Sequence, residues 1–136
     1  MPRVGAANGY RNGMKVGVCA LLLLAAPTLG LGGEPPYQPD RFFRTQILPI
    51  LERRCFECHS QEHEVEGGLA LDSKKGWQTG GEAGPAITPG NLKLSPLIQA
   101  VRHHDAETAM PPKKKLPPIE IALLETWVLL GAPDPR

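Results

Sequence analysis

The sequence predicts a small all-helical domain with long loops. Three stretches carry apolar residues at helical spacing, beginning near Asp40, Ser95 and Pro118. The stretches between them are rich in glycine and proline, which favour turns and irregular backbone. A chain of 136 residues has room for one domain and little more.

The first 33 residues have the layout of an export signal. Three basic residues precede an apolar run at 16–26, and small residues follow it. This order is typical of a secretory signal peptide, so we expect residues 1–33 to be removed and residues 34–136 to form the domain. The uncharged residues 16–33 also reach the lower limit for an uncleaved membrane anchor, which would then be the part in contact with a membrane. Both alternatives place the domain in the periplasm or otherwise outside the cytoplasm.

The charge balance of the domain is slightly acidic. Residues 1–33 hold 3 of the 15 basic residues and none of the 14 acidic ones, which leaves 12 against 14 in the rest of the chain. Nucleic-acid binding depends on a basic surface, so this balance argues against a nucleic-acid partner.

Asp40 is predicted to cap the first helix. After it, Phe43, Ile47 and Leu51 recur every four residues and form one apolar face. Pro49 lies within this pattern, and a proline in a helix interior costs about 3 kcal/mol. We therefore expect a kink, or a restart of the helix with Pro49 in its first turn.

The second half of the domain is predicted to alternate loops and short helices. Residues 60–94 are expected to be mostly loop, with a short helical turn after Asp72. Ser95 and Pro96 can form the N-cap and first turn of a helix that ends at about His103. Its inward-facing residues would be Leu97, Ile98 and Val101.

A last helix is predicted to begin near Pro118 and to end at Gly131, after an irregular proline-rich stretch at 110–118. Its apolar stripe would consist of Ile119, Leu123, Trp127 and Leu130. A domain of this size with few aromatic residues and long connections has a limited core of its own. A large apolar cofactor would supply part of the missing core.

Cys55, Cys58 and His59 form a C-x-x-C-H pattern, which is typical of covalent haem attachment. Two thiols one helical turn apart can reach the two vinyl groups of a porphyrin, and the adjacent histidine is then directed at the iron. Attachment of this kind belongs to the oxidising side of the membrane, in agreement with an export signal. The pattern predicts one haem c, with His59 as an iron ligand.

Three other uses of the cysteines stay open. A redox-active pair would be expected at the start of a helix that follows a strand, and no strand-like run precedes Cys55. Zinc could be bound by Cys55, Cys58, His59 and His63, although no loop separates the two ligand pairs as it does in most tetrahedral sites. A plain structural disulfide is the third alternative.

Met110 is predicted to be the second iron ligand. It is the only methionine downstream of the predicted signal peptide, and it lies in a loop stiffened by two prolines. Ligation by histidine and methionine raises the reduction potential of a haem. His103 or His104 would take its place in a bis-histidine site, whereas His63 is expected to be a solvated loop residue.

Five segments resemble, in the same order, the planctomycete-type cytochrome c domain. They are residues 47–59, 67–73, 80–90, 110–116 and 119–133. The resemblance implies a class I cytochrome c-like fold around one covalent haem, with Cys55 and Cys58 as attachment points. It also implies His59 as the proximal ligand and Met110 as the distal ligand.

The expected function is one-electron transfer to an unidentified redox protein, with no catalytic residue. The alternative is a haem-based peroxidase or ligand sensor, in which the Met110 loop opens and His103, His104 or Glu107 supplies acid–base chemistry. The lysines at 113–115 directly follow that loop. They are either a docking patch for an acidic partner or an ordinary solvated run.

Overall fold

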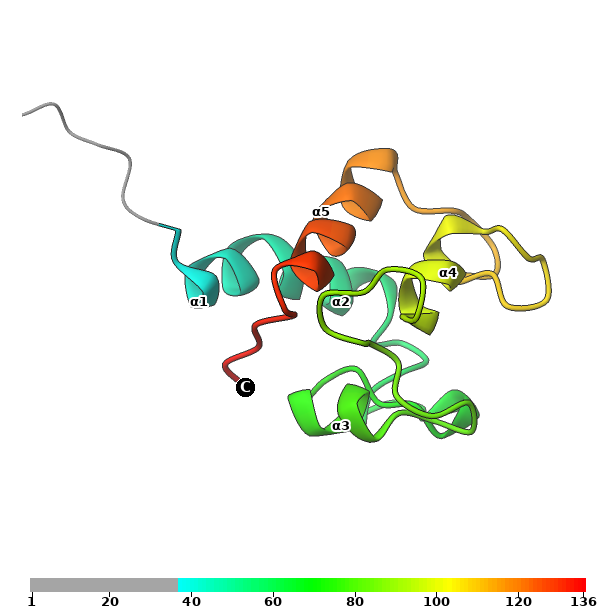
Figure 1. Cartoon of the computed structure of the whole chain (residues 1–136). Coiled ribbons are helices and arrows are strands. Elements are labelled where there is room, and N and C mark those ends of the chain that lie inside the picture. The colour runs from blue at the N-terminus through cyan, green and yellow to red at the C-terminus, as the bar shows by residue number, and fades with distance from the viewer. Residues whose placement is uncertain (1–36) are drawn as a thin grey trace, which may run out of the picture. The chain divides into compact units, whose positions relative to one another are not determined.

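The computed structural model describes residues 37–136, and all of their regular elements are helices (Figure 1). The extended pairings among these residues are two isolated bridges, His59 with Val65 and Gly81 with Gly84. The predicted all-helical class with long loops is therefore confirmed.

The predicted export signal at 1–33, including the alternative anchor at 16–33, lies outside the described residues. Within the described part of the chain, the longest helix has 12 residues. None of the helices there is long and apolar enough to cross a membrane.

Three short helices follow one another without a break at the start of the described chain. They are α1 (Pro39–Phe42), the π-helix η1 (Phe43–Ile47) and α2 (Leu48–Arg54). The N-cap of α1 is Gln38, so the predicted cap at Asp40 is wrong. Proline at the first position needs no N–H partner and starts the helix earlier, which leaves Asp40 inside the first turn.

Pro49 lies in the first turn of α2, as predicted for a restart. Its ring needs space near the carbonyl four residues earlier, and the wider turn of the π-helix is located there. The three residues predicted to face inward, Phe43, Ile47 and Leu51, are buried.

The long loop after α2 contains the predicted turn of helix. This is α3 (Lys74–Thr79), and it is preceded by a single 3₁₀ turn, η2 (Glu66–Gly68). Ser73 caps α3, since its hydroxyl accepts a hydrogen bond from the Gly76 N–H at 3.0 Å.

The next helix, α4 (Pro96–Arg102), has Ser95 at its N-cap position, as predicted. The Ser95 side chain makes no capping bond to α4. Its hydroxyl instead donates to the Asn91 carbonyl at 2.7 Å and accepts from the Thr88 N–H at 2.9 Å, so it fastens the preceding loop. The helix buries the three predicted residues, Leu97, Ile98 and Val101.

The predicted apolar stripe of the last helix, α5 (Pro118–Leu129), is wrong for two of its four residues. Ile119 is 67% exposed, and Leu130, just past the helix, is 49% exposed. Most residues of α5 are apolar, so apolar side chains occur on every side and periodicity alone cannot select the packed face. The residues that α5 buries are Leu124, Trp127 and Val128.

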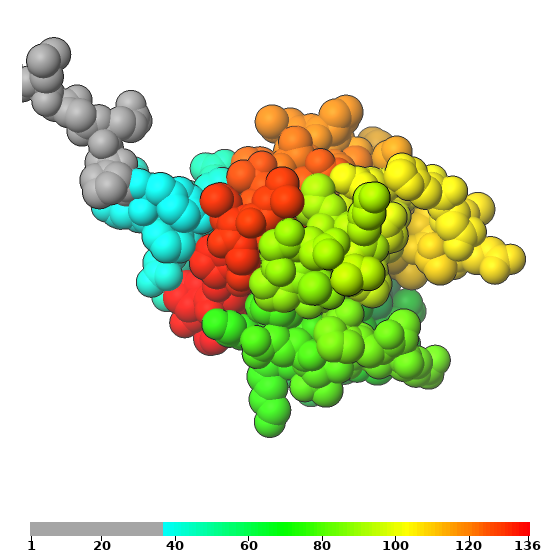
Figure 2. Space-filling view, in the orientation of Figure 1, coloured from blue at the N-terminus to red at the C-terminus, as the bar shows by residue number. Residues whose placement is uncertain are grey.

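Trp127 is at the centre of the core. Its ring packs against Phe43 at 5.7 Å and edge-on against Trp77 at 6.3 Å, measured between ring centroids. The C-terminal segment closes over these rings, because the Trp127 indole N–H donates to the Pro133 carbonyl at 2.8 Å and that of Trp77 to Asp134 at 3.0 Å. Figure 2 shows this segment, in red, lying against the first helices, in cyan.

Candidate functional site

The C-x-x-C-H residues form one tight turn directly after α2. The Cys55 N–H donates to the Leu51 carbonyl at 2.9 Å and so ends the helix. The Cys55 carbonyl then accepts from the N–H groups of Cys58, at 3.2 Å, and His59, at 2.9 Å. The two cysteines are therefore one helical turn apart, as the spacing predicted.

Both thiols are free and poorly ionised. Burial, and then the negative charge of Glu120, raise the pKa of Cys55 to about 12, although Arg54 opposes the shift. Burial also raises the pKa of Cys58, and nearby carboxylates, of which Glu66 is the strongest, add to the effect.

This environment does not fit a redox-active cysteine pair. Such pairs depend on a thiolate stabilised at a helix N-terminus, whereas Cys55 lies at the C-terminal end of α2, where the helix dipole disfavours negative charge. The two cysteines also form no disulfide. Two neutral, unpaired thiols held one turn apart suit thioether formation.

The ring of His59 is oriented by the loop that follows it. Its Nδ1 lies 3.3 Å from the Leu69 carbonyl. A carbonyl oxygen can only accept, so Nδ1 carries the proton and Nε2 keeps a free lone pair. The main chain is held as well, because the Leu71 N–H donates to the His59 carbonyl at 2.8 Å. A histidine fixed through one ring nitrogen presents the other to a metal.

The structure does not bring the proposed zinc ligands together. In the described part of the chain, the group whose ligand atoms lie within 4.8 Å of one another is Cys58, Glu64 and Glu66. Cys55, His59 and His63 are not part of it. His63 is exposed, as expected for a solvated loop residue.

Met110 lies half-buried in the loop between α4 and α5, and its backbone is tied to α4. Its N–H donates to the Ala100 carbonyl at 3.1 Å. Its carbonyl lies 3.1 Å from Nε2 of His103. His104 and Glu107, the other candidates in this loop, are exposed.

Two observations place the continuation of this loop near the cysteine turn. Lys113 is close enough to Cys58 for its positive charge to oppose the rise in the thiol pKa. Leu116 is buried in the core cluster, and Cys55 packs against the same cluster. The loop that carries Met110 therefore returns to the side of the molecule that holds the cysteines.

An ion pair that the sequence did not reveal joins the cysteine turn to α5. Nε of Arg54 lies 3.0 Å from Oε2 of Glu120, and a second guanidinium nitrogen lies 3.2 Å from Oε1. The two residues are 66 positions apart and share no motif. This bidentate contact fixes the end of α2 beside the start of α5.

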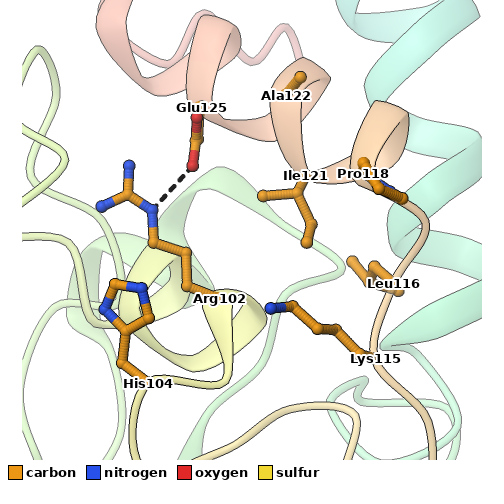
Figure 3. A pocket seen from close by; sticks show the side chains of 8 residues that line it. All are labelled: Arg102, His104, Lys115, Leu116, Pro118, Ile121, Ala122 and Glu125. Atoms are coloured by element: carbon orange, nitrogen blue, oxygen red, sulfur yellow. Dashed lines mark hydrogen bonds and ion pairs between the residues drawn. The ribbon is translucent and has the colours of Figure 1, made fainter.

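A groove of about 490 Å³ opens between the end of α4 and the start of α5 (Figure 3). Arg102 crosses it to bind Glu125 at 2.8 Å, and Ile121 and Leu116 line it with apolar surface. None of its lining residues belongs to the cysteine turn, so the groove is separate from the attachment site.

The chain matches the model of the family described as Planctomycete cytochrome C over residues 55–114, a span that begins at Cys55 and includes Met110. No curated protein and no solved structure matches the chain significantly.

Proposed function

We propose, from the premise that residues 55–114 form a planctomycete cytochrome C domain, that this chain carries one covalent haem c and transfers single electrons. The observation that carries the proposal is the turn of two free thiols followed by a histidine whose Nε2 is available. When bound, the haem supplies an iron that alternates between two oxidation states one electron apart.

The residues of the turn fit this group in their chemistry. Cys55 and Cys58 would hold the haem through two thioether bonds, in which each sulfur joins one carbon of a vinyl group and the thiol hydrogen goes to the neighbouring carbon. The addition needs free thiols, and Cys55 and Cys58 form no disulfide with each other in the structure. His59 supplies the first axial nitrogen, and its bond to Leu69 keeps the ring from rotating.

Met110 is the second axial ligand in this proposal. The favourable observations are the position of its loop beside the cysteine turn and the two bonds that fix its backbone. His103 is a poorer candidate, because its Nε2 must carry a proton to bond the Met110 carbonyl, which leaves only Nδ1, the ring nitrogen next to the main chain, for iron. Ligation by His59 and Met110 would raise the reduction potential, as suits an electron carrier.

An electron carrier also fits better than a peroxidase or ligand sensor. Acid–base chemistry at a haem needs a polar side chain held over the open iron position. Of the three candidates, His103 is already bonded to Met110, and His104 and Glu107 are exposed. No residue is therefore assigned a catalytic role.

Carbon monoxide binding to the reduced holoprotein tests this choice. With both axial positions filled, the wild-type protein should not bind carbon monoxide, and its oxidised form should show a weak sulfur-to-iron charge-transfer band. Met110→Ala should abolish the band and open the iron to carbon monoxide, while Met110→His should abolish the band and lower the potential. An unchanged spectrum in Met110→Ala would refute ligation by Met110.

The partner in this proposal is an acidic redox protein that docks beside Lys113, Lys114 and Lys115. All three lysines are exposed, and Lys113 lies close enough to Cys58 for its positive charge to oppose the rise in the thiol pKa. The export signal predicted at 1–33 would bring the domain to the periplasm or another location outside the cytoplasm, where haem c is attached.

A further inference from the structure

The backbone of Met110 is bonded on both sides to the C-terminal end of α4. Its N–H donates to the carbonyl of Ala100, and its carbonyl accepts from the ring of His103, each at 3.1 Å. The Ala100 carbonyl lies in the last turn of α4 and also accepts from the His103 N–H at 3.0 Å, so one carbonyl holds both the start of the loop and Met110. The end of α4 thus serves as an anchor for the loop.

The rest of the loop offers few other anchors near Met110. Pro111 and Pro112 follow it, and neither has an N–H to donate. Asp105 accepts from the Glu107 N–H at 3.1 Å and from the Thr108 hydroxyl at 3.0 Å, but these bonds lie within the loop and do not fasten it to the domain. The next fixed point along the chain is Leu116, which is buried.

The backbone of His103 is in an unusual conformation that directs its ring at Met110. His103 is the C-cap of α4 and has φ 55° and ψ 40°, in the left-handed region. Glycine and asparagine are the common residues at such helix ends, and a residue with a Cβ adopts this conformation at a cost in free energy. In this left-handed conformation the His103 ring contacts the main chain of Met110. The conformational cost therefore accompanies a contact with the proposed ligand.

We propose that His103 is a positioning residue for Met110. His103 holds the ligand loop closed because its Nε2–H donates to the Met110 carbonyl. The proposal rests on the function proposed above, in which Met110 is the axial ligand. Without this bond the loop would open more often, and an external ligand would compete more easily for the iron.

Imidazole binding to the oxidised holoprotein tests the proposal. His103→Gly suits the left-handed backbone and removes only the ring, so the domain should stay folded. The affinity for imidazole should rise about fivefold, the effect expected for the loss of one ordinary hydrogen bond. The charge-transfer band should weaken in parallel. His103→Asn, which also tolerates the left-handed region but is too short to reach the carbonyl, should behave in the same way.

Two further variants separate positioning from other effects. His104→Ala removes the neighbouring exposed histidine and should leave the imidazole affinity unchanged. In a Met110→Ala background, His103→Gly should have no further effect, because there is no ligand left to position. An additional effect in that background would mean that His103 acts on the incoming ligand, and would overturn the proposal.

The two proposals fail in different ways. If Met110→Ala opens the iron while both His103 variants bind imidazole as the wild type does, His103 is not a positioning residue and ligation by Met110 stands. If the wild-type protein has no charge-transfer band and Met110→Ala changes nothing, ligation by Met110 is refuted and the role of His103 falls with it.

Discussion

The core around Trp127 and the loop at 103–116 hold their residues in place by different means. The core relies on packed rings and aliphatic side chains that are almost fully buried. The loop relies on a few bonds to the backbone, with Leu116 as its buried residue. The residues with a proposed function lie outside the packed core. Met110 is half-buried in the loop, and the turn of Cys55, Cys58 and His59 follows the end of α2.

The difference has a consequence for stability and for function. Core contacts are numerous, so they contribute most to the free energy of unfolding. Contacts in the loop are few and each contributes little, but each decides where a functional atom lies. Substitutions in the two regions should therefore separate into those that change stability and those that change ligand access or electron transfer.

The largest effect is expected in the core. Leu124 is fully buried in α5, and Leu124→Ala should lower the free energy of unfolding by about 2–5 kcal/mol. Ile119→Ala, on the same helix but at an exposed position, should change it by no more than about 0.5 kcal/mol. Urea unfolding of the holoprotein measures both. A larger loss for Ile119→Ala than for Leu124→Ala would mean that α5 packs through the stripe predicted from the sequence.

That pair of variants also marks the limit of the sequence prediction. The first helix and its restart at Pro49, the short helix α3 and the start of α4 were predicted because proline, serine and regular apolar spacing are local signals. The packed face of α5 was not, because its residues are apolar on every side and only the tertiary contacts with Phe43 and Trp77 select one face.

The candidate site divides in the same way. Cys55, Cys58 and His59 were predicted from one short motif, and their turn is confirmed. The contacts that orient the site join residues that are distant in the sequence. His59 and Leu69 are 10 positions apart, and Arg54 and Glu120 are 66 positions apart, so neither pair has a sequence signature. The role of Met110 as a ligand stays a prediction.

A smaller loss of stability is expected where the C-terminal segment closes the core. Burial alone would raise the pKa of Asp134, but hydrogen bonds from Arg136 and Trp77 outweigh it and hold the pKa below its ordinary value. The ionised carboxylate therefore stabilises the fold above the ordinary carboxyl range near pH 4, and this contribution is lost as the pH falls through the lowered pKa.

Asp134→Asn should cost about 1–3 kcal/mol at neutral pH and should remove this part of the acid dependence. The urea midpoint, followed as the pH is lowered from 7 to 2, measures the effect. Glu62→Gln, which replaces an exposed carboxylate, serves as the control and should keep the wild-type profile. A profile of Asp134→Asn that is parallel to the wild type would show that the carboxylate does not link pH to stability.

The smallest effect on the fold is expected from the three lysines of the loop. Replacing Lys113, Lys114 and Lys115 with glutamine should leave stability and spectrum nearly unchanged, because all three are exposed. Electron transfer to an acidic acceptor protein should slow with rising salt in the wild type, since charges are screened over about 10 Å at 0.1 M. The triple variant should have a flatter salt dependence.

Two exposed lysines of α3, Lys74 and Lys75, provide the matched control. Their replacement with glutamine removes charge from another part of the surface and should leave most of the salt dependence intact. The docking proposal would be refuted by a triple variant with the same salt slope as the wild type. It would also be refuted by a control pair that flattens the slope as strongly.

The most direct test of the central claim is extraction of haem from the denatured protein, after expression together with a c-type haem assembly system. Thioether bonds to Cys55 and Cys58 should keep the haem with the polypeptide through acid and organic extraction. The Cys55→Ala, Cys58→Ala double variant should release any haem that it holds. Release of haem from the wild-type chain, or a wild-type chain that acquires none, would contradict the assignment.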